Sequence, residues 1–199
     1  MLFQKNIVTP ELILASSSKR RINLISLLGL KFKVHPSKIS EIIKKNETPK
    51  LHVARLSCEK VLAVSPFYKK KNVIIIGADT IVFLKEEIIN KPTSKKDAIK
   101  ILSKLSGKKH FVFTGITLLN LRNNKMITDV VKTEVHFRKL AIQEIKKYVA
   151  SGSSSDKAGA YGIQDDFGAF FVKKINGCYY NVVGFPLQKI QQALNKIIK

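Results

Sequence analysis

The segment from Val73 to Val82 constrains the fold of this chain more than any other, because an apolar run leads directly into an acidic residue. Val73–Ile76 has no polar position, which is typical of a strand covered on both faces. Asp79 follows shortly after, and a buried carboxylate is costly unless cations or hydrogen bonds compensate it. Ligands of open α/β sheets lie beyond the carboxyl ends of strands, so we expect Asp79 at a ligand site. A turn carboxylate that caps local amides is the open alternative.

The remaining apolar patterns predict strands alternating with helices, and therefore an α/β fold. The helix that begins at Thr48-Pro49 is expected to bury Leu51 and Leu62 among its apolar side chains. Asn176-Gly177 is expected to turn a hairpin between strands at Phe170–Ile175 and Tyr179–Val183. Further strands are expected at Leu12–Ala15, Phe32–His35, Thr80–Leu84, Ile88–Ile89, His110–Leu121 and Met126–Arg138, and further helices after Ser16-Ser17-Ser18, after Ser94, at Ile142–Ala150 and from Pro186.

A phosphate site is indicated where the first expected strand meets the first helix. Ser16-Ser17-Ser18 is followed by Lys19-Arg20-Arg21, and the helical pattern continues to Gly29. Free amides at a helix N-terminus, hydroxyls and guanidinium groups together bind phosphate well. Because the helix dipole disfavours cations at that end, two arginines there indicate that an anion neutralises them. Two solvated arginines on an exposed turn are the alternative interpretation.

Composition excludes several classes of protein. The 199 residues contain 45% hydrophobic residues, enough for a core in one domain spanning 1–199, and no apolar run of membrane-spanning length. The sequence start resembles no signal peptide, and two cysteines make no disulfide framework, so a cytoplasmic protein is expected. The net charge of +22 comes mainly from scattered lysines. A lysine-rich surface that attracts polyanionic small substrates explains this charge better than a specific nucleic-acid face.

Carboxylates and cations recur next to strand ends and glycine-rich segments, which fits a magnesium–polyphosphate site. The sequence has no Walker A loop, and its histidines and cysteines show neither zinc spacing nor a Cys–His pair. The candidate carboxylates are Asp79, Glu41, Asp156, Asp165 and Asp166, and the candidate cations are Arg20, Arg21, Lys91 and Lys157.

Several motifs, in order, resemble the Maf family of nucleotide pyrophosphatases over Leu12 to about Leu187. They are Leu14-Ala15-Ser16-Ser17-Ser18-Lys19-Arg20-Arg21, Gly77-Ala78-Asp79-Thr80, Asn90-Lys91-Pro92, Leu105-Ser106-Gly107, Ser151-Gly152, Asp156–Gln164 and Asn181–Leu187.

The resemblance implies a central mixed sheet flanked by helices, with two lobes around a cleft, as in inosine triphosphatase-like proteins. It implies hydrolysis of dTTP and UTP to the monophosphate and pyrophosphate with Mg²⁺ or Mn²⁺, in the clearance of non-standard nucleotides or in cell-division arrest. A homodimer is left open, and no membrane partner is expected.

The resemblance also assigns roles to matching residues. Asp79 is expected to accept the proton of the attacking water and, with Glu41, to bind the metal. The expected substrate contacts are Ser16, Arg20, Arg21, Thr80, Lys91, Gln164 and Lys60; the residues Arg20, Thr80 and Gln164 are those expected to select dTTP and UTP. Without the resemblance, Lys60 near a helix end would be a surface lysine.

Five residues depart from the family pattern: Lys19, Ser153, Ser154, Asp165 and Cys178. Asp165 stands beside the expected base pocket, so the same reaction on a modified or purine nucleotide is an alternative. An alternative of another class is a basic regulator of septum formation that binds nucleic acid or a partner protein. The net charge favours this second alternative.

Overall fold

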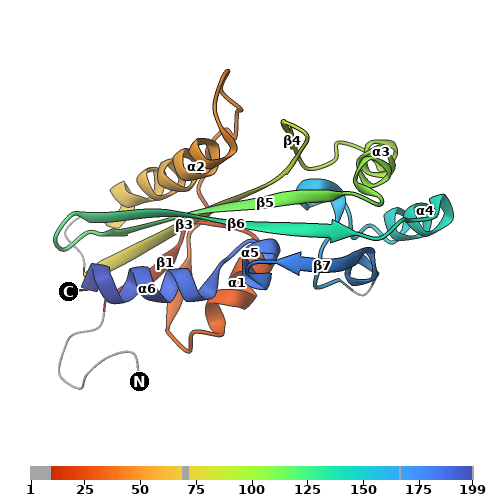
Figure 1. Ribbon diagram of the computed structural model, residues 1–199. Helices are drawn as coiled ribbons and strands as arrows, with labels where there is room; N and C mark the ends of the chain where they lie inside the picture. The colour runs from red at the N-terminus through yellow and green to blue at the C-terminus, as the bar shows by residue number, and fades with distance from the viewer. Residues whose placement is uncertain (1–9, 69–71, 166, 199) are drawn as a thin grey trace. The chain divides into compact units, whose positions relative to one another are not determined.

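The computed structural model describes residues 10–68, 72–165 and 167–198 (Figure 1). Within these ranges the strands form a mixed seven-stranded sheet. Its order is β2 (Phe32–Val34), β1 (Glu11–Leu14), β3 (Val73–Leu84), β5 (Lys109–Asn120), β6 (Lys125–Phe137) and β7 (Val172–Asn176), with β4 (Glu87–Ile89) paired to β3. β1 is parallel to β2 and β3, whereas β3 and β4, like β6 and β7, are antiparallel. The predicted α/β class with a central mixed sheet is therefore confirmed. The sequence start, where no signal peptide is expected, and the candidate Asp166 lie outside the described residues.

The chain divides into two compact units. Unit 1 contains Met1–Asp79, Thr114–Val131 and Gly184–Lys199, and unit 2 contains Thr80–Phe113 and Lys132–Val183. Three long strands contribute residues to both units: β3 (Val73–Leu84), β5 (Lys109–Asn120) and β6 (Lys125–Phe137).

Unit 1 has helices on both faces of its part of the sheet (Figure 1). On α2, Ser57 Oγ lies 2.9 Å from Thr117 Oγ1, whereas Asn120 Nδ2 donates to the carbonyl of Ile197 on α6 at 3.0 Å. Thr117 and Asn120 are three residues apart on β5, so they point to opposite faces. The other elements of unit 1 are β1 (Glu11–Leu14), α1 (Lys19–Ser26), β2 (Phe32–Val34), α2 (Pro49–Val64), η1 (Ser65–Tyr68) and α6 (Leu187–Ile198).

Two strand glycines allow α2 to lie directly against the sheet. A Cβ atom at Gly77 of β3 would be 2.5 Å from the carbonyl oxygen of Ser57 and 2.8 Å from Val61 Cγ2. A Cβ atom at Gly115 of β5 would overlap the carbonyl group of Val53. Glycine is therefore required at both positions for close approach of the helix backbone.

Unit 2 has its own apolar core, in which side chains of α3, α4 and the glycine-rich segment around Gly159 and Gly162 meet. Leu102, Tyr148 and Tyr161 are among its buried members, and Phe137 and Tyr161 pack edge to face with ring centroids 4.7 Å apart. The elements that belong to unit 2 alone are β4 (Glu87–Ile89), α3 (Lys95–Leu105), α4 (Ile142–Ala150), η2 (Ala158–Ala160), η3 (Gly168–Phe171), β7 (Val172–Asn176) and α5 (Tyr179–Val183).

Three local predictions are wrong. The strands expected separately at Val73–Ile76 and Thr80–Leu84 are one continuous strand, Val73–Leu84. Gly77 lies within it and allows close packing of α2 without breaking the strand. Tyr179–Val183 is a helix, in which Asn181 Nδ2 donates to the carbonyl of Val112 at 3.1 Å and to Thr133 Oγ1 at 2.9 Å. On α2, Leu51 and Leu62 are exposed, and the helix instead buries polar Ser57 and Lys60.

Two further expectations can be compared with the structure. No helix in the described ranges is long and apolar enough to cross a membrane. Cys58 and Cys178 are both free thiols, as their spacing indicates.

We predict that Gly115→Ala destabilises the protein by more than the roughly 1–3 kcal/mol typical of overpacking, because the new methyl group meets backbone that cannot rotate away. Gly152→Ala is the matched control. Gly152 has φ of +82° but no atom within 4 Å of an added Cβ, so only backbone strain of about 1–2 kcal/mol is expected. Urea unfolding of both variants measures the difference, and equal losses would contradict this account of α2 packing.

Candidate active site

Asp79 lies on β3 just beyond the point where the neighbouring strand β1 ends. β1 and β3 are paired up to Leu14 and Ile76, after which β1 ends and β3 continues through Asp79. The residue is only 4% exposed. A carboxylate this deeply buried needs compensation, which the neighbouring helix provides.

Lys60 of α2 is the compensating cation. Its ammonium group lies 2.7 Å from Asp79 Oδ1 and also contacts the carbonyl of Ala78 at 3.4 Å. Gly77 and Asp79 are two residues apart on β3, so they share a face. The close approach at Gly77 brings Lys60 Cβ to 3.4 Å from the position of an added Cβ, and from there the long side chain reaches Asp79. Lys60 is therefore a buried partner of Asp79 and not a surface lysine.

Glu41 completes an acidic pair around the same ammonium group. Glu41 Oε1 lies 2.6 Å from Lys60 Nζ, and its side chain is 43% exposed. The two carboxylates that the family resemblance assigned to a metal are thus on either side of one lysine. This pair has one buried and one accessible member.

The loop that carries Glu41 is fastened to α2 by Arg55. The Arg55 guanidinium donates to both carboxylate oxygens of Glu47, at 2.6 and 2.7 Å, and to the carbonyl of Ile42 at 2.9 Å. His52 Nδ1 lies 2.9 Å from Glu47 Oε2. The hydrogen bonds from Arg55 lower the pKa of Glu47 to about 2. Because Ile42 is next to Glu41, this cluster fixes the backbone beside the accessible carboxylate.

Ser16 and Arg21 are hydrogen-bonded to each other at the start of α1, where the sequence predicts a phosphate site. Ser16 Oγ accepts from the amide of Ser18 at 3.2 Å and from Arg21 Nη1 at 3.3 Å. Arg21 Nε donates to the carbonyl of Gly184 at 3.0 Å. Burial lowers the pKa of Arg21, while the nearby charges of Asp79 and Glu41 act in the opposite direction. Arg21 is therefore in the electrostatic field of the acidic pair.

Thr80 and Lys91 lie in unit 2, on segments that adjoin its glycine-rich loop. A Cβ atom at Gly159 would be 2.8 Å from Val82 Cγ2, and Thr80 shares a face of β3 with Val82. The amide of Gly159 donates to the carbonyl of Asn90 at 3.3 Å, directly before Lys91. Both residues are thus close in the fold to the segment that leads into Gln164.

Gln164 is exposed and makes a side-chain hydrogen bond to its neighbour. Its Nε2 donates to Asp165 Oδ1 at 2.9 Å. The other carboxylate oxygen of Asp165 accepts from the Tyr148 hydroxyl at 3.0 Å and lies 3.2 Å from Lys157 Nζ. Asp165, a departure from the family pattern, is therefore held by Gln164, Tyr148 and Lys157 and is not an isolated surface charge.

The residues present fit a hard divalent cation. In the described part of the chain no three His, Cys, Asp or Glu side chains gather as metal ligands, and the two carboxylates that the resemblance assigned to a metal, Asp79 and Glu41, both pair with Lys60. Mg²⁺ commonly binds one or two carboxylates and takes its remaining ligands from water and substrate phosphates. Asp79 and Glu41 are two such carboxylates, and their charges act on the nearby Arg21.

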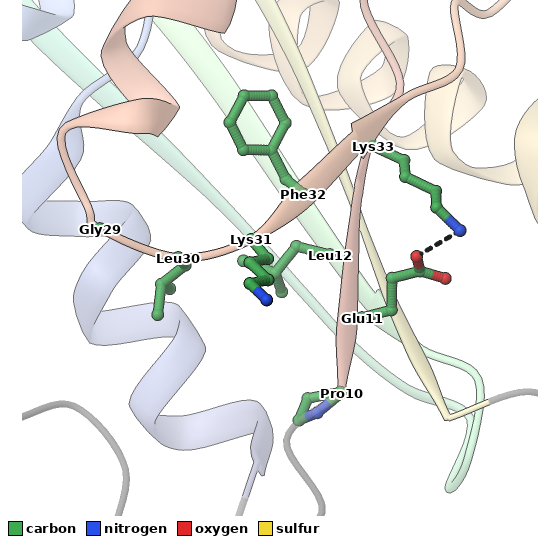
Figure 2. A pocket seen from close by; sticks show the side chains of 8 residues that line it. All are labelled: Pro10, Glu11, Leu12, Gly29, Leu30, Lys31, Phe32 and Lys33. Atoms are coloured by element: carbon green, nitrogen blue, oxygen red, sulfur yellow. Dashed lines mark ion pairs between the residues drawn. The ribbon is translucent and has the colours of Figure 1, made fainter.

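A separate hollow of about 760 Å³ lies at the other end of β1 (Figure 2). Pro10, Leu12 and Phe32 line it, and Lys33 pairs with Glu11 at 2.6 Å on its rim. Ligands of α/β sheets bind at the carboxyl ends of strands, whereas this hollow is at the amino ends of β1 and β2. It is therefore not the candidate active site.

Of the predicted site residues, the structure brings Ser16, Arg21, Glu41, Lys60 and Asp79 together in unit 1 and shows Thr80, Lys91 and Gln164 in unit 2. Arg20 contributes to the electrostatics of Arg21. Sequence reasoning missed the carbonyl of Gly184 and the Arg55–Glu47 cluster. A signal for the cluster existed, because Arg55 and Glu59 have the i,i+4 spacing of a helical ion pair, 3.1 Å apart here.

Comparisons with known proteins find relatives along nearly the whole chain. The family model described as Maf-like protein matches residues 11–197. The chain is 45% identical to the dTTP/UTP pyrophosphatase of Dictyoglomus thermophilum (94% of this chain, 96% of the relative) and 44% identical to that of Aquifex aeolicus (93% and 94%). Among solved structures it resembles a HAM1 protein from Coxiella burnetii, with TM-score 0.51, 15% identity, and 94% and 99% coverage, a likeness of fold alone.

We predict that Lys60→Met destabilises the protein by about 3 kcal/mol or more at neutral pH, because Asp79 would keep a buried charge without its partner. Adding Asp79→Asn should recover much of that loss, so the two changes are strongly non-additive. Lys189→Met, which breaks an exposed 3.0 Å pair with Asp129, should cost at most about 1 kcal/mol. Urea unfolding of the single and double variants measures the coupling, and additive losses would refute the buried pair.

We predict that acid weakens the Arg55–Glu47 cluster in a defined pH range. The folded-state pKa of Glu47 is depressed from 4.5 to about 2, so its contribution is present above pH 4.5 and is lost as pH falls towards 2. The stability difference between wild type and Glu47→Gln should therefore shrink from pH 5 to pH 2 in chemical unfolding. Glu59→Gln removes the more exposed carboxylate on the same arginine and should cost less at neutral pH. A difference independent of pH would show that Glu47 is not ionised in this pair.

Proposed function

This chain belongs to the family of Maf-like proteins, and from that membership we propose that it hydrolyses dTTP and UTP to the nucleoside monophosphate and pyrophosphate. The observation that carries the proposal is the buried Asp79 paired with Lys60, which also pairs with Glu41, together with the electrostatic influence of both carboxylates on Arg21, the hydrogen-bond partner of Ser16. Relatives named dTTP/UTP pyrophosphatase support the choice of substrate.

The site residues of unit 1 have separate roles in the proposed reaction. Arg21, Lys60 and Ser16 bind the triphosphate and offset its charge, which is most of what phosphoryl transfer needs. Asp79 accepts a proton from a water molecule that attacks the α-phosphorus. The attack comes from the side opposite the oxygen that bridges the α- and β-phosphorus atoms. The bond from the α-phosphorus to that oxygen then breaks, and pyrophosphate leaves.

Asp79 and Glu41 would also hold a divalent cation, Mg²⁺ or Mn²⁺. When bound, such an ion supplies positive charge to the phosphate oxygens. Glu41 suits this role because it is accessible, and the Arg55 cluster keeps its loop close to Asp79.

Arg20, Thr80, Lys91 and Gln164 are proposed as further substrate contacts on the family motifs. Arg20, Thr80 and Gln164 are the set associated with dTTP and UTP. The second candidate is the same cleavage of a modified or purine nucleotide. Asp165 motivates it, because this residue is hydrogen-bonded to Gln164 and stands where the sequence departs from the family pattern.

A panel of natural and modified triphosphates with Mg²⁺ or Mn²⁺, with product identification, tests the proposal. We expect dTTP and UTP to be cleaved best, with pyrophosphate as the direct product. Orthophosphate released directly would rule the proposal out, and a preference for purine nucleotides would establish the second candidate.

We predict that Asp79→Asn lowers kcat by at least about 10²-fold while leaving the fold intact, because the variant has no base at this position. Asp129→Asn is the matched control: it removes a lysine-paired carboxylate of the same unit, and the rate should be unchanged. Near-wild-type turnover by a folded Asp79→Asn protein would overturn the role given to Asp79.

A further inference from the structure

The hydrogen bond between Gln164 and Asp165 determines which group Gln164 can offer to a ligand. A carboxylate only accepts hydrogen bonds, whereas a glutamine amide has a donor end and an acceptor end. Contact with Asp165 Oδ1 at 2.9 Å therefore requires the amide nitrogen of Gln164 to face Asp165. The carbonyl oxygen is left on the other side of the amide as the acceptor available to a ligand.

Asp165 is itself held in place by donors. The Tyr148 hydroxyl accepts from the amide of Gly162 at 3.2 Å, so it uses its own proton to donate to Asp165 Oδ2. Lys157, which can only donate, lies 3.2 Å from the same oxygen. Tyr148 is 1% exposed, and its burial raises the pKa of the phenol, so it remains a donor at neutral pH.

The backbone leaves room for this carboxylate. A Cβ atom at Gly162 would overlap both oxygens of Asp165, so the carboxylate lies directly against the glycine. The amide of Asp165 also donates to the carbonyl of Gly162 at 3.1 Å. Position 165 thus has one oxygen facing two donors and one oxygen facing Gln164.

We propose that Asp165 is a positioning residue for base selection: it fixes the Gln164 amide as a hydrogen-bond acceptor for the N3–H group of uracil or thymine. This inference rests on the proposed function. Cytosine presents an unprotonated N3 acceptor in the same position, so its N3 would face the glutamine oxygen without a proton between them. An unsatisfied polar contact of this kind costs about 1–3 kcal/mol, or roughly 5- to 150-fold in specificity.

Asp165→Asn tests the inference, because it should reverse the glutamine. The asparagine oxygen would remain towards the two donors, Tyr148 and Lys157, and its NH₂ group would take the position of Oδ1. Gln164 must then turn its oxygen towards that NH₂ group and offer its own NH₂ group to the base. We expect the ratio of kcat/KM for UTP to that for CTP to fall by at least about 10-fold, with the rate on CTP unchanged or raised.

If the role of Asp165 were purely structural, Asp165→Asn would lower kcat/KM for UTP and for CTP together and leave their ratio unchanged. That result would overturn the inference while the proposed function stands. Glu87→Gln, which removes an exposed carboxylate paired with Lys104 in the same unit, should leave the ratio and the rate as in wild type. If Asp165→Asn does not fold, 3-methyl-UTP with wild-type protein decides the matter. Lacking N3–H, it should be cleaved at least about 10-fold less efficiently than UTP, and equal cleavage would refute the inference.

A wild-type protein that cleaves no triphosphate would disprove the proposed function, and binding would then test the inference separately. Calorimetry with UMP and CMP should show tighter binding of UMP by wild type and a loss of that preference in Asp165→Asn. No binding of either nucleotide, or the same preference in both proteins, would overturn the inference.

Discussion

The buried ion pair of Lys60 and Asp79 is the interaction on which the rest of the candidate site depends. Both side chains are 6% exposed, and neither charge could be buried alone without a large desolvation cost. Their pairing keeps a carboxylate inside the protein beside a second, accessible carboxylate on Glu41. A polyphosphate and a hard cation can use this combination of fixed charges because little reorganisation is needed when they bind.

The fold supports that pair through backbone contacts as well as side chains. Gly77 and Gly115 let α2 lie against β3 and β5, which determines how far Lys60 can reach. Arg55 connects the same helix to the loop of Glu41, and Gly184 holds the guanidinium of Arg21 through its carbonyl. Lys60, both carboxylates and Arg21 are therefore positioned by neighbouring residues to which we assign no part in the reaction.

The sequence predicted the parts of this arrangement that depend on local pattern. The apolar run before Asp79 and the turn chemistry of Thr48-Pro49 have local physical causes, and the structure agrees with them. Helix α1 begins after the three serines as expected, but Ser18 at its N-cap makes no side-chain capping hydrogen bond. Tertiary contacts decided the rest. The segment Tyr179–Val183, an expected strand, is a helix from which Asn181 donates hydrogen bonds to Val112 and Thr133. The burial of Lys60 follows from packing that no helical periodicity reveals.

In the proposed reaction these unit 1 groups direct water to the first phosphorus of the triphosphate. Hydrolysis of dTTP in ¹⁸O-labelled water tests this claim most directly, because the label marks the phosphorus that was attacked. We predict that mass spectrometry finds the label in thymidine monophosphate and none in pyrophosphate. Label in pyrophosphate would place the attack on the second phosphorus and contradict the account.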